Sequence, residues 1–299
     1  MTRGKTWAIS LAAFWLVAVA CAQLGGNQSK RSASPNPATA IALSVPNGSI
    51  YLVDPATGTQ TQLVAGLGDF QDGYAAWSPD HKQLAYGNHG LFVLDMSNQK
   101  SRLVVPQDQM SMPAWSPSGE VLAYGNGSSL WVAPLNGLPP VQIHIPATLA
   151  PVAMSWSSDG IAFQGIHRDC DRSYLCPTTG NSDIWTVQAD ATELQQVTHL
   201  RKALAPKWSP DSSSILFVRT FARGARELWV VEADGSHPKQ VGTAEDVLSA
   251  DWSPDGKQIV MARRGLEGAT IRLWITDASG TSARPVGGMV QGKEATVDW

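Results

Sequence analysis

The sequence predicts an all-β fold, a β-propeller of six four-stranded blades, and three observations lead to this prediction. A Trp-Ser pair occurs five times, at intervals of 38 to 52 residues along the 299-residue chain. Each pair is followed by the same series of short apolar segments, and the two ends of the chain together supply one further series. Four strands repeated every 40 to 50 residues or so are typical of propeller blades.

The first strand of each unit ends at its tryptophan and leads into a tight turn. These tryptophans are Trp77, Trp115, Trp156, Trp208 and Trp252. The residues that follow are Ser, Pro, Asp and Gly, as in Trp252-Ser253-Pro254-Asp255-Gly256. Pro presets its φ angle, Asp and Ser bond to nearby backbone, and Gly accepts positive φ, so a short hairpin connection is expected here.

Three further strands are expected in each unit. Second strands are predicted at 83–86, 121–124, 161–163, 215–218 and 258–261. Third strands are predicted at 91–95, 130–132, 184–187, 228–231 and 273–277, and fourth strands at 102–105, 141–144, 196–198, 239–241 and 284–286. We assign the repeated Trp and Asp residues to packing between blades and to turn geometry.

The sixth blade is expected to be shared between the chain ends. Segments 41–44, 50–54 and 62–64 have the pattern of second, third and fourth strands, but no Trp-Ser strand precedes them. Segment 295–299 supplies that strand. Pairing of 295–299 with the strands within 40–65 would close the ring and cover sheet edges that otherwise promote aggregation.

The repeated Trp-Ser-Pro-Asp-Gly turn, followed by a Leu-Ala-Tyr-like strand and an Ile-Trp-Val-like strand, resembles the TolB-type propeller repeat. That repeat also occurs in propellers of prolyl oligopeptidase-type peptidases. The resemblance implies a six-bladed propeller with protein partners in the bacterial cell envelope. TolB carries an additional domain before its propeller and the peptidases a hydrolase domain after theirs, and we expect neither here.

The N-terminus is predicted to be an export signal. Arg3 and Lys5 precede an uncharged run at 7–20 that is short for a membrane span and suitable for a signal-peptide core. The run ends in Ala18-Val19-Ala20-Cys21, which resembles a lipoprotein box with lipidation at Cys21, although Ala18 stands where Leu is usual. Ordinary cleavage of the same small residues and an uncleaved anchor are the alternatives. We expect a periplasmic or outer-surface lipoprotein, or a secreted protein.

The domain boundaries follow from composition. Residues 1–20 are the predicted signal peptide, 21–39 the lipidated cysteine and a polar tether, and 40–299 the propeller. The formal charge is −3, and it becomes more negative when the signal with its two cations is removed. Nucleic acid is therefore not expected as a partner, membrane contact is expected only through the lipid, and a monomer is expected.

Two cysteines lie in one polar segment. Cys170 and Cys176 are expected to form a disulfide in an exported protein. His167, Asp169 and Asp171 could complete a metal site with them, but structural zinc sites usually show two clustered ligand pairs. We therefore predict no metal and no cofactor.

Catalytic motifs were sought in the sequence. The Gly-x-Ser-x-Gly nucleophile elbow of α/β-hydrolases is absent. The histidines form no closely spaced ligand pair, so turn or strand-surface roles are expected for them. They are His81, His89, His144, His167, His199 and His237.

The loops between second and third strands lie on the same face as the loops between blades, so together they form a rim. Trp156 and Trp185 are 29 residues apart, against 15 to 22 in the other units, which indicates an insertion in that rim. Loops of this kind often bind partners, and arginine offers a planar fork of donors for carboxylates. The predicted partner-binding rim comprises Arg168, Arg172, Tyr174, Arg201, Lys202, Phe221, Arg223, Arg226, Arg263 and Arg264. The opposite part of the rim is acidic, with Asp69, Asp72 and Asp108.

The predicted function is a non-enzymatic binding or scaffold protein of the cell envelope that holds a protein or peptide partner on this rim. A solvated loop surface, in which nearby acids cancel the arginines, is the simpler interpretation. The alternative function is an envelope enzyme acting on peptide or glycan, with acids such as Asp69, Asp72 and Asp246 at the channel mouth. An ion-stabilised structural module is a third possibility.

Overall fold

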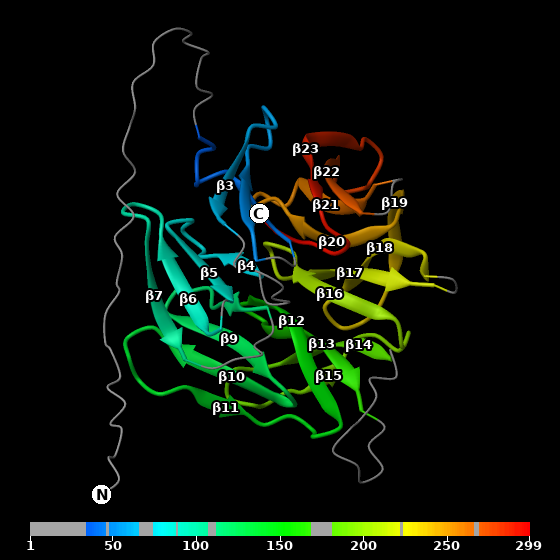
Figure 1. Ribbon diagram of the computed structural model, residues 1–299. Helices are drawn as coiled ribbons and strands as arrows, with labels where there is room; N and C mark the ends of the chain where they lie inside the picture. Colours follow the sequence, from blue (N-terminus) through cyan, green and yellow to red (C-terminus); the bar gives the residue numbers. More distant parts are fainter. Residues whose placement is uncertain are drawn as a thin grey trace, which may run out of the picture. The chain divides into compact units, whose positions relative to one another are not determined.

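The computed structural model describes residues 34–45, 48–65, 74–87, 89–106, 112–168, 181–221, 224–265 and 269–299. Strands dominate these residues, and they form six four-stranded antiparallel sheets arranged as a ring of blades (Figure 1). Within these ranges, no helix is long and apolar enough to cross a membrane. The predicted all-β, six-bladed propeller is confirmed.

We number the blades from the one that contains the first strand. Blade 1 contains β24 (Thr296–Asp298), β1 (Ile41–Ser44), β2 (Ile50–Val53) and β3 (Gln60–Val64), in that spatial order. Blade 2 contains β4 (Ala75–Trp77), β5 (Gln83–Gly87), β6 (Leu91–Asp95) and β7 (Lys100–Val105). Blade 3 contains β8 (Ala114–Trp115), β9 (Val121–Asn126), β10 (Ser129–Pro134) and β11 (Val141–Ile143).

The inner strands of the remaining blades are longer. Blade 4 contains β12 (Leu149–Ser157), β13 (Gly160–His167), β14 (Ser182–Val187) and β15 (Gln195–Gln196). Blade 5 contains β16 (Ala203–Trp208), β17 (Ser214–Thr220), β18 (Arg226–Glu232) and β19 (Lys239–Glu245). Blade 6 contains β20 (Val247–Trp252), β21 (Gln258–Arg264), β22 (Thr270–Asp277) and β23 (Arg284–Gln291).

Blade 1 joins the two ends of the propeller. Strand β24 pairs antiparallel with β1, with Ala42 opposite Asp298 and Leu43 opposite Val297. Leu43 and Val297 are both almost completely buried. The predicted ring closure is therefore present, and every blade has four strands.

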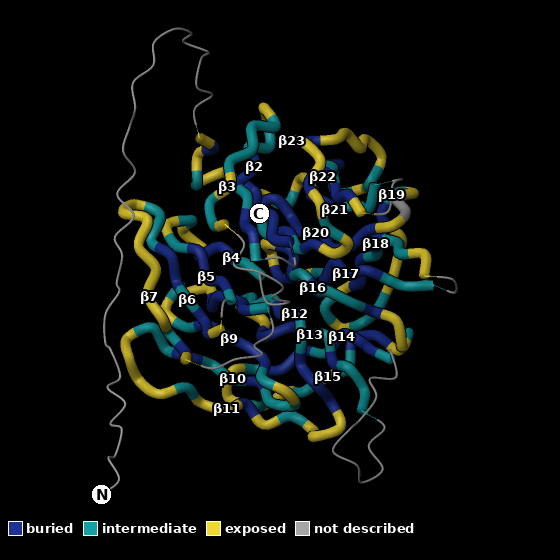
Figure 2. The backbone as a smooth tube through the Cα atoms, in the orientation of Figure 1, coloured by how far each residue is buried: buried dark blue, intermediate teal, exposed yellow. Residues whose placement is uncertain are grey.

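The core lies between neighbouring blades and along their inner strands. Second-strand residues such as Leu84, Phe163 and Phe217 have no exposed surface, whereas the outer strand β7 is largely exposed. Figure 2 shows the same gradient, with dark blue inner strands and yellow on the outer strands β7 and β11. The indole nitrogen of Trp115 donates to the carbonyl of Ala76 at 2.9 Å. The repeated tryptophan therefore contributes to packing between blades, as predicted.

The Trp-Ser turns are held by a recurrent set of side-chain hydrogen bonds. The Ser78 hydroxyl donates to Asp80 at 2.7 Å and accepts from the backbone N–H of Gln83 at 2.9 Å. The hydrogen bond from Ser78, then that from the backbone of Lys82, lowers the pKa of Asp80. Equivalent bonds join Ser209 to Asp211 and Ser253 to Asp255. The predicted turn role of the repeated Asp is confirmed.

The inner strands of blades 4, 5 and 6 are longer than predicted and irregular. Each of β12, β16 and β20 has a shift of register against its neighbour, near Ala153, Ala205 and Leu248 respectively. Ala153 and Ala205 have positive φ angles of 48° and 49°. Bulges bend a strand and re-aim its side chains, and here they change the wall of the central channel.

A candidate binding pocket on the loop rim

The structure describes seven of the residues in the predicted rim. In an antiparallel four-stranded blade, the loop between second and third strands and the loop to the next blade lie on one face. The described members of the predicted rim are Arg168, Arg201, Lys202, Phe221, Arg226, Arg263 and Arg264. Arg172, Tyr174, Arg223, Cys170, Cys176, Cys21, Asp69, Asp72 and Asp108 lie outside the described residues.

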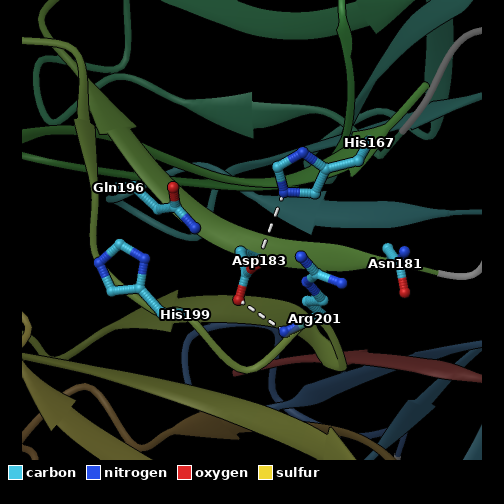
Figure 3. Close-up of a pocket in the computed structure, with 6 residues that line it drawn as sticks. All are labelled: His167, Asn181, Asp183, Gln196, His199 and Arg201. Carbon is cyan, nitrogen blue, oxygen red and sulfur yellow. Dashed lines mark hydrogen bonds and ion pairs between the residues drawn. The ribbon is translucent and has the colours of Figure 1, made fainter. Parts of the chain in front are cut away.

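A polar pocket of about 460 Å³ opens on this rim where blade 4 meets blade 5. We call it the Arg201 pocket, and it is lined by His167, Asn181, Asp183, Gln196, His199 and Arg201. Figure 3 shows these side chains gathered from the end of β13, the start of β14, β15 and the loop that leads to β16. Of the predicted rim, this pocket includes Arg201, and Lys202 is its chain neighbour.

Asp183 fixes the loop that forms one wall of the Arg201 pocket. Its side chain is buried, with 1% of the residue exposed. Its Oδ1 accepts hydrogen bonds from the Thr198 hydroxyl at 2.9 Å and from the backbone N–H groups of Leu200 at 2.7 Å and Arg201 at 3.0 Å. The Asp183 carboxylate therefore holds the loop between blades 4 and 5 in place through three hydrogen bonds.

The other carboxylate oxygen of Asp183 faces His167. Its Oδ2 lies 3.5 Å from Nε2 of His167, whose side chain is about one third exposed. The His167 ring also packs at a tilt against Trp185, with ring centroids 6.2 Å apart. The carboxylate and Trp185 together orient the His167 ring in the pocket.

Replacing Asp183 with alanine is expected to lower the free energy of unfolding by about 2–4 kcal/mol, because buried donors lose their acceptor. Asp183→Asn should cost clearly less, since an amide oxygen can still accept the Oδ1 hydrogen bonds. Urea denaturation of the three proteins measures both differences. Equal stability of the alanine variant and the parent would contradict the anchoring role.

Two predicted rim arginines of blades 5 and 6, Arg226 and Arg264, meet at one carboxylate. Arg226 donates to both oxygens of Glu294, at 2.8 and 3.2 Å, and Arg264 contacts the same carboxylate at 3.3 Å. The Arg263 guanidinium lies 5.1 Å above the Trp274 ring, and Arg219 lies 4.6 Å above Phe221. These arginines therefore have partners within the propeller. One of the partners, Glu294, lies on the segment that leads into β24.

A second cavity, of about 390 Å³, occupies the central channel on the face of the Trp-Ser turns. Lys207 of β16 lies between two carboxylates, contacting Asp251 of β20 at 2.8 Å and also pairing with Asp298 of β24. Asp298 accepts a further hydrogen bond from the backbone of Trp77 at 2.6 Å. Lys207 thereby joins three consecutive blades, and Trp77 connects a fourth.

These channel residues were not among the predicted site residues, although the repeat carries a signal for them. Each one immediately precedes the tryptophan of its unit. The residues at that position are Ala76, Ala114, Ser155, Lys207, Asp251 and Asp298. Blades 2, 3 and 4 have small residues at this position. Blades 5, 6 and 1 have charged residues there. Comparing this column between repeats would have predicted the ion cluster.

The ionisation of the channel acids predicts a pH dependence of stability. Burial raises the pKa of Asp251 to about 7, with nearby Asp298 adding to the rise and Lys207 opposing it. The folded protein then holds a proton that the unfolded chain has lost. Stability should fall as the pH rises from about 4 to about 7 and should level off above that.

Urea denaturation of the parent and of Asp251→Asn between pH 5 and pH 8 tests this dependence. The variant is expected to show a smaller slope of stability against pH. Asp80→Asn is the matched control, because the lowered pKa of Asp80 affects stability only below about pH 4. An unchanged slope in Asp251→Asn would contradict the assignment.

The residues considered for metal binding and acid catalysis lie partly within the described ranges. Among these residues, no group of three or more His, Cys, Asp or Glu side chains is placed to hold a metal ion. Asp246 lies exposed between β19 and β20 with a positive φ of 55°. Its predicted companions Asp69 and Asp72 lie outside the described ranges.

Comparison with known proteins shows which solved structures have a similar fold. No family model matches the sequence, and no curated protein matches it. Among solved structures, TolB from Acinetobacter baumannii is similar with a TM-score of 0.69 at 15% identity, over 87% of this chain and 66% of that one. The chain thus spans just under two thirds of that TolB.

Two further likenesses concern proteins of different kinds. A chain of a nidogen/laminin complex has a TM-score of 0.65 at 11% identity, over 86% of this chain and 98% of that one. An oligogalacturonate lyase in complex with manganese has a TM-score of 0.53 at 16% identity, over 80% and 70% of the two chains. At such identities the likeness concerns the fold alone. The chain is therefore a six-bladed β-propeller that is similar in fold to TolB.

Proposed function

We propose that this protein is a non-enzymatic binding or scaffold protein of the bacterial cell envelope, which holds a protein or peptide partner on the loop rim. The observation that carries this proposal is the Arg201 pocket. It lies on the predicted rim, and its loop presents Arg201 and Lys202 as exposed side chains. The volume lies within the range of ligand pockets, and the polar lining suits a polar or charged group of a partner.

The likeness to TolB supports a binding role at the level of the fold, and a propeller with a similar fold occurs in a complex of nidogen with laminin. The envelope location is supported by the predicted export signal. Lipidation at Cys21 belongs to the same proposal. Mass spectrometry of the protein purified from membranes would reveal an acylated Cys21 or a chain that starts elsewhere.

An enzyme is the second candidate, because one specific observation favours it. His167 and Asp183 form an imidazole–carboxylate pair in the pocket, which is an arrangement used by general bases. Oligogalacturonate lyase is among the proteins of similar fold. Turnover of a peptide or an acidic glycan that is lost in His167→Ala would favour the enzyme and contradict the scaffold.

A pull-down from detergent-solubilised envelopes tests the binding function. The bait is the chain from Cys21 onward, compared with a variant that carries Arg168→Ala, Arg201→Ala and Lys202→Ala. Lys82→Ala with Lys257→Ala is the matched control, because both lysines are exposed on the face of the Trp-Ser turns. We expect a protein that is retained by the parent and the control and lost by the rim variant.

Two results would overturn the proposal. Retention of the same proteins by all three baits would remove the rim from the interaction. Retention of no protein by any bait would contradict a stable protein partner and would direct attention to small molecules and glycans.

A further inference from the structure

The Arg201 pocket is rich in hydrogen-bond donors. Arg201 carries a guanidinium, Asn181 an amide, and His167 and His199 imidazoles. Arg201 is exposed, and its side chain forms no ion pair with any residue in the described ranges. A guanidinium offers parallel N–H groups that match the two oxygens of a carboxylate.

The main chain of Arg201 is held on both sides, so its side chain starts from a fixed position. Its N–H donates to Asp183 at 3.0 Å, and its carbonyl accepts from the N–H of Ser182 at 3.3 Å. The Ser182 hydroxyl also donates to the carbonyl of Ala203 at 2.8 Å. Fixing a binding residue before the ligand arrives lowers the ordering cost of binding.

The negative charge of the buried Asp183 carboxylate does not prevent an anion from binding in the pocket. Its Oδ1 already accepts three hydrogen bonds, and its Oδ2 faces His167. The exposed charged groups of the loop at 199–202 are the cations Arg201 and Lys202. Among the described residues of this loop, the exposed charge is therefore positive.

Gln196 adds a different function to the pocket. Its Nε2 donates to the carbonyl of Thr198 at 2.8 Å, which fixes the orientation of the amide. Its carbonyl oxygen is then an acceptor in a pocket whose lining also includes the donors of Arg201 and Asn181. A peptide presents such a combination, because it carries a carboxylate together with backbone N–H groups.

We propose that the Arg201 pocket binds one carboxylate of a peptide partner, with Arg201 as the ion-pairing residue and Gln196 as acceptor for a peptide N–H. This inference rests on the proposed binding function and specifies its ligand. The carboxylate belongs either to a chain end or to an acidic side chain, and the volume of about 460 Å³ is large enough for either.

Short peptides serve as probes, titrated into the whole chain from Cys21 onward by calorimetry and by NMR at millimolar concentration. The first is acetyl-Ala-Ala-Ala with a free carboxylate, and the second is its C-terminal amide. The third, acetyl-Ala-Glu-Ala-amide, carries a side-chain carboxylate only. Digalacturonate supplies a carboxylate on a glycan.

We expect saturable binding of the first or the third peptide, with the amide at least about tenfold weaker. Binding to the first supports a chain end, and binding to the third supports an acidic side chain. Arg201→Ala should weaken binding at least about tenfold, and Arg201→Lys should recover part of it. Lys257→Ala should bind like the parent. The melting temperatures of the variants verify that the loop is intact.

Three outcomes would overturn the inference. They are equal binding of acid and amide, binding unaffected by Arg201→Ala, and binding of digalacturonate alone. If the peptides fail to bind but the pull-down partner is still lost with the rim variant, the proposed function stands without this ligand. If the pull-down fails as well, both are contradicted.

Discussion

Removal of residues 295–299 is expected to lower the melting temperature by about 10 °C or more, because it takes away the inner strand of blade 1. Strand β24 contributes the buried Val297 and its backbone pairing with β1. The deletion also removes Asp298, which accepts from the backbone of Trp77 and pairs with Lys207. Together these losses are of the order of 5 kcal/mol.

Differential scanning calorimetry measures the effect, and removal of Trp299 alone is the control. That shorter deletion leaves the β1–β24 pairing and Asp298 in place. A melting temperature within a few degrees of the parent after removal of 295–299 would mean that the ring does not depend on this closure.

Lys207→Ala is expected to lower the free energy of unfolding by about 3–5 kcal/mol, because two buried carboxylates lose the cation between them. Burial lowers the pKa of Lys207, but Asp251 and Asp298 outweigh burial and leave the pKa above its usual range. The ammonium is therefore charged at neutral pH. Without it, Asp251 and Asp298 face each other across a cavity.

The control for this substitution is Lys82→Ala. Lys82 also pairs with an aspartate, Asp80, but its side chain is 81% exposed, and exposed pairs contribute little to stability. Urea denaturation should separate the two variants clearly. A cost for Lys207→Ala as small as that for Lys82→Ala would show that the ion cluster does not stabilise the ring. Adding Asp251→Asn to Lys207→Ala should restore part of the loss, and a larger part at higher pH, because the raised pKa of Asp251 leaves this carboxyl partly protonated near neutral pH.

The propeller could be predicted from the sequence because each blade repeats the same pattern of turn and strand residues. The Trp-Ser-Pro-Asp turn encodes its own geometry through the hydrogen bonds of residues such as Ser78 and Asp80, and alternation of apolar residues encodes the strands. The bulges at Ala153 and Ala205 could not be predicted in this way. They require alanine at positive φ, which only the surrounding ring imposes.

The candidate site was predicted less completely, because its contacts join residues distant in sequence. The loop arginines were found from composition, yet Arg226 is 68 residues from Glu294, and nothing in its own segment indicates that pairing. Asp183 was missed because it immediately precedes the strand predicted at 184–187, where an aspartate is expected to be exposed in a loop. Its role appears only when the loop to the next blade folds over it.

The pairing of β24 with β1 has a consequence for how the molecule is made. Ala42 pairs with Asp298, so more than 250 residues must be synthesised before this contact can form. Until then β1 carries an open edge, and contacts of such long range form slowly. Blade 1 is therefore expected to be completed late, after the strands of the other five blades have been synthesised.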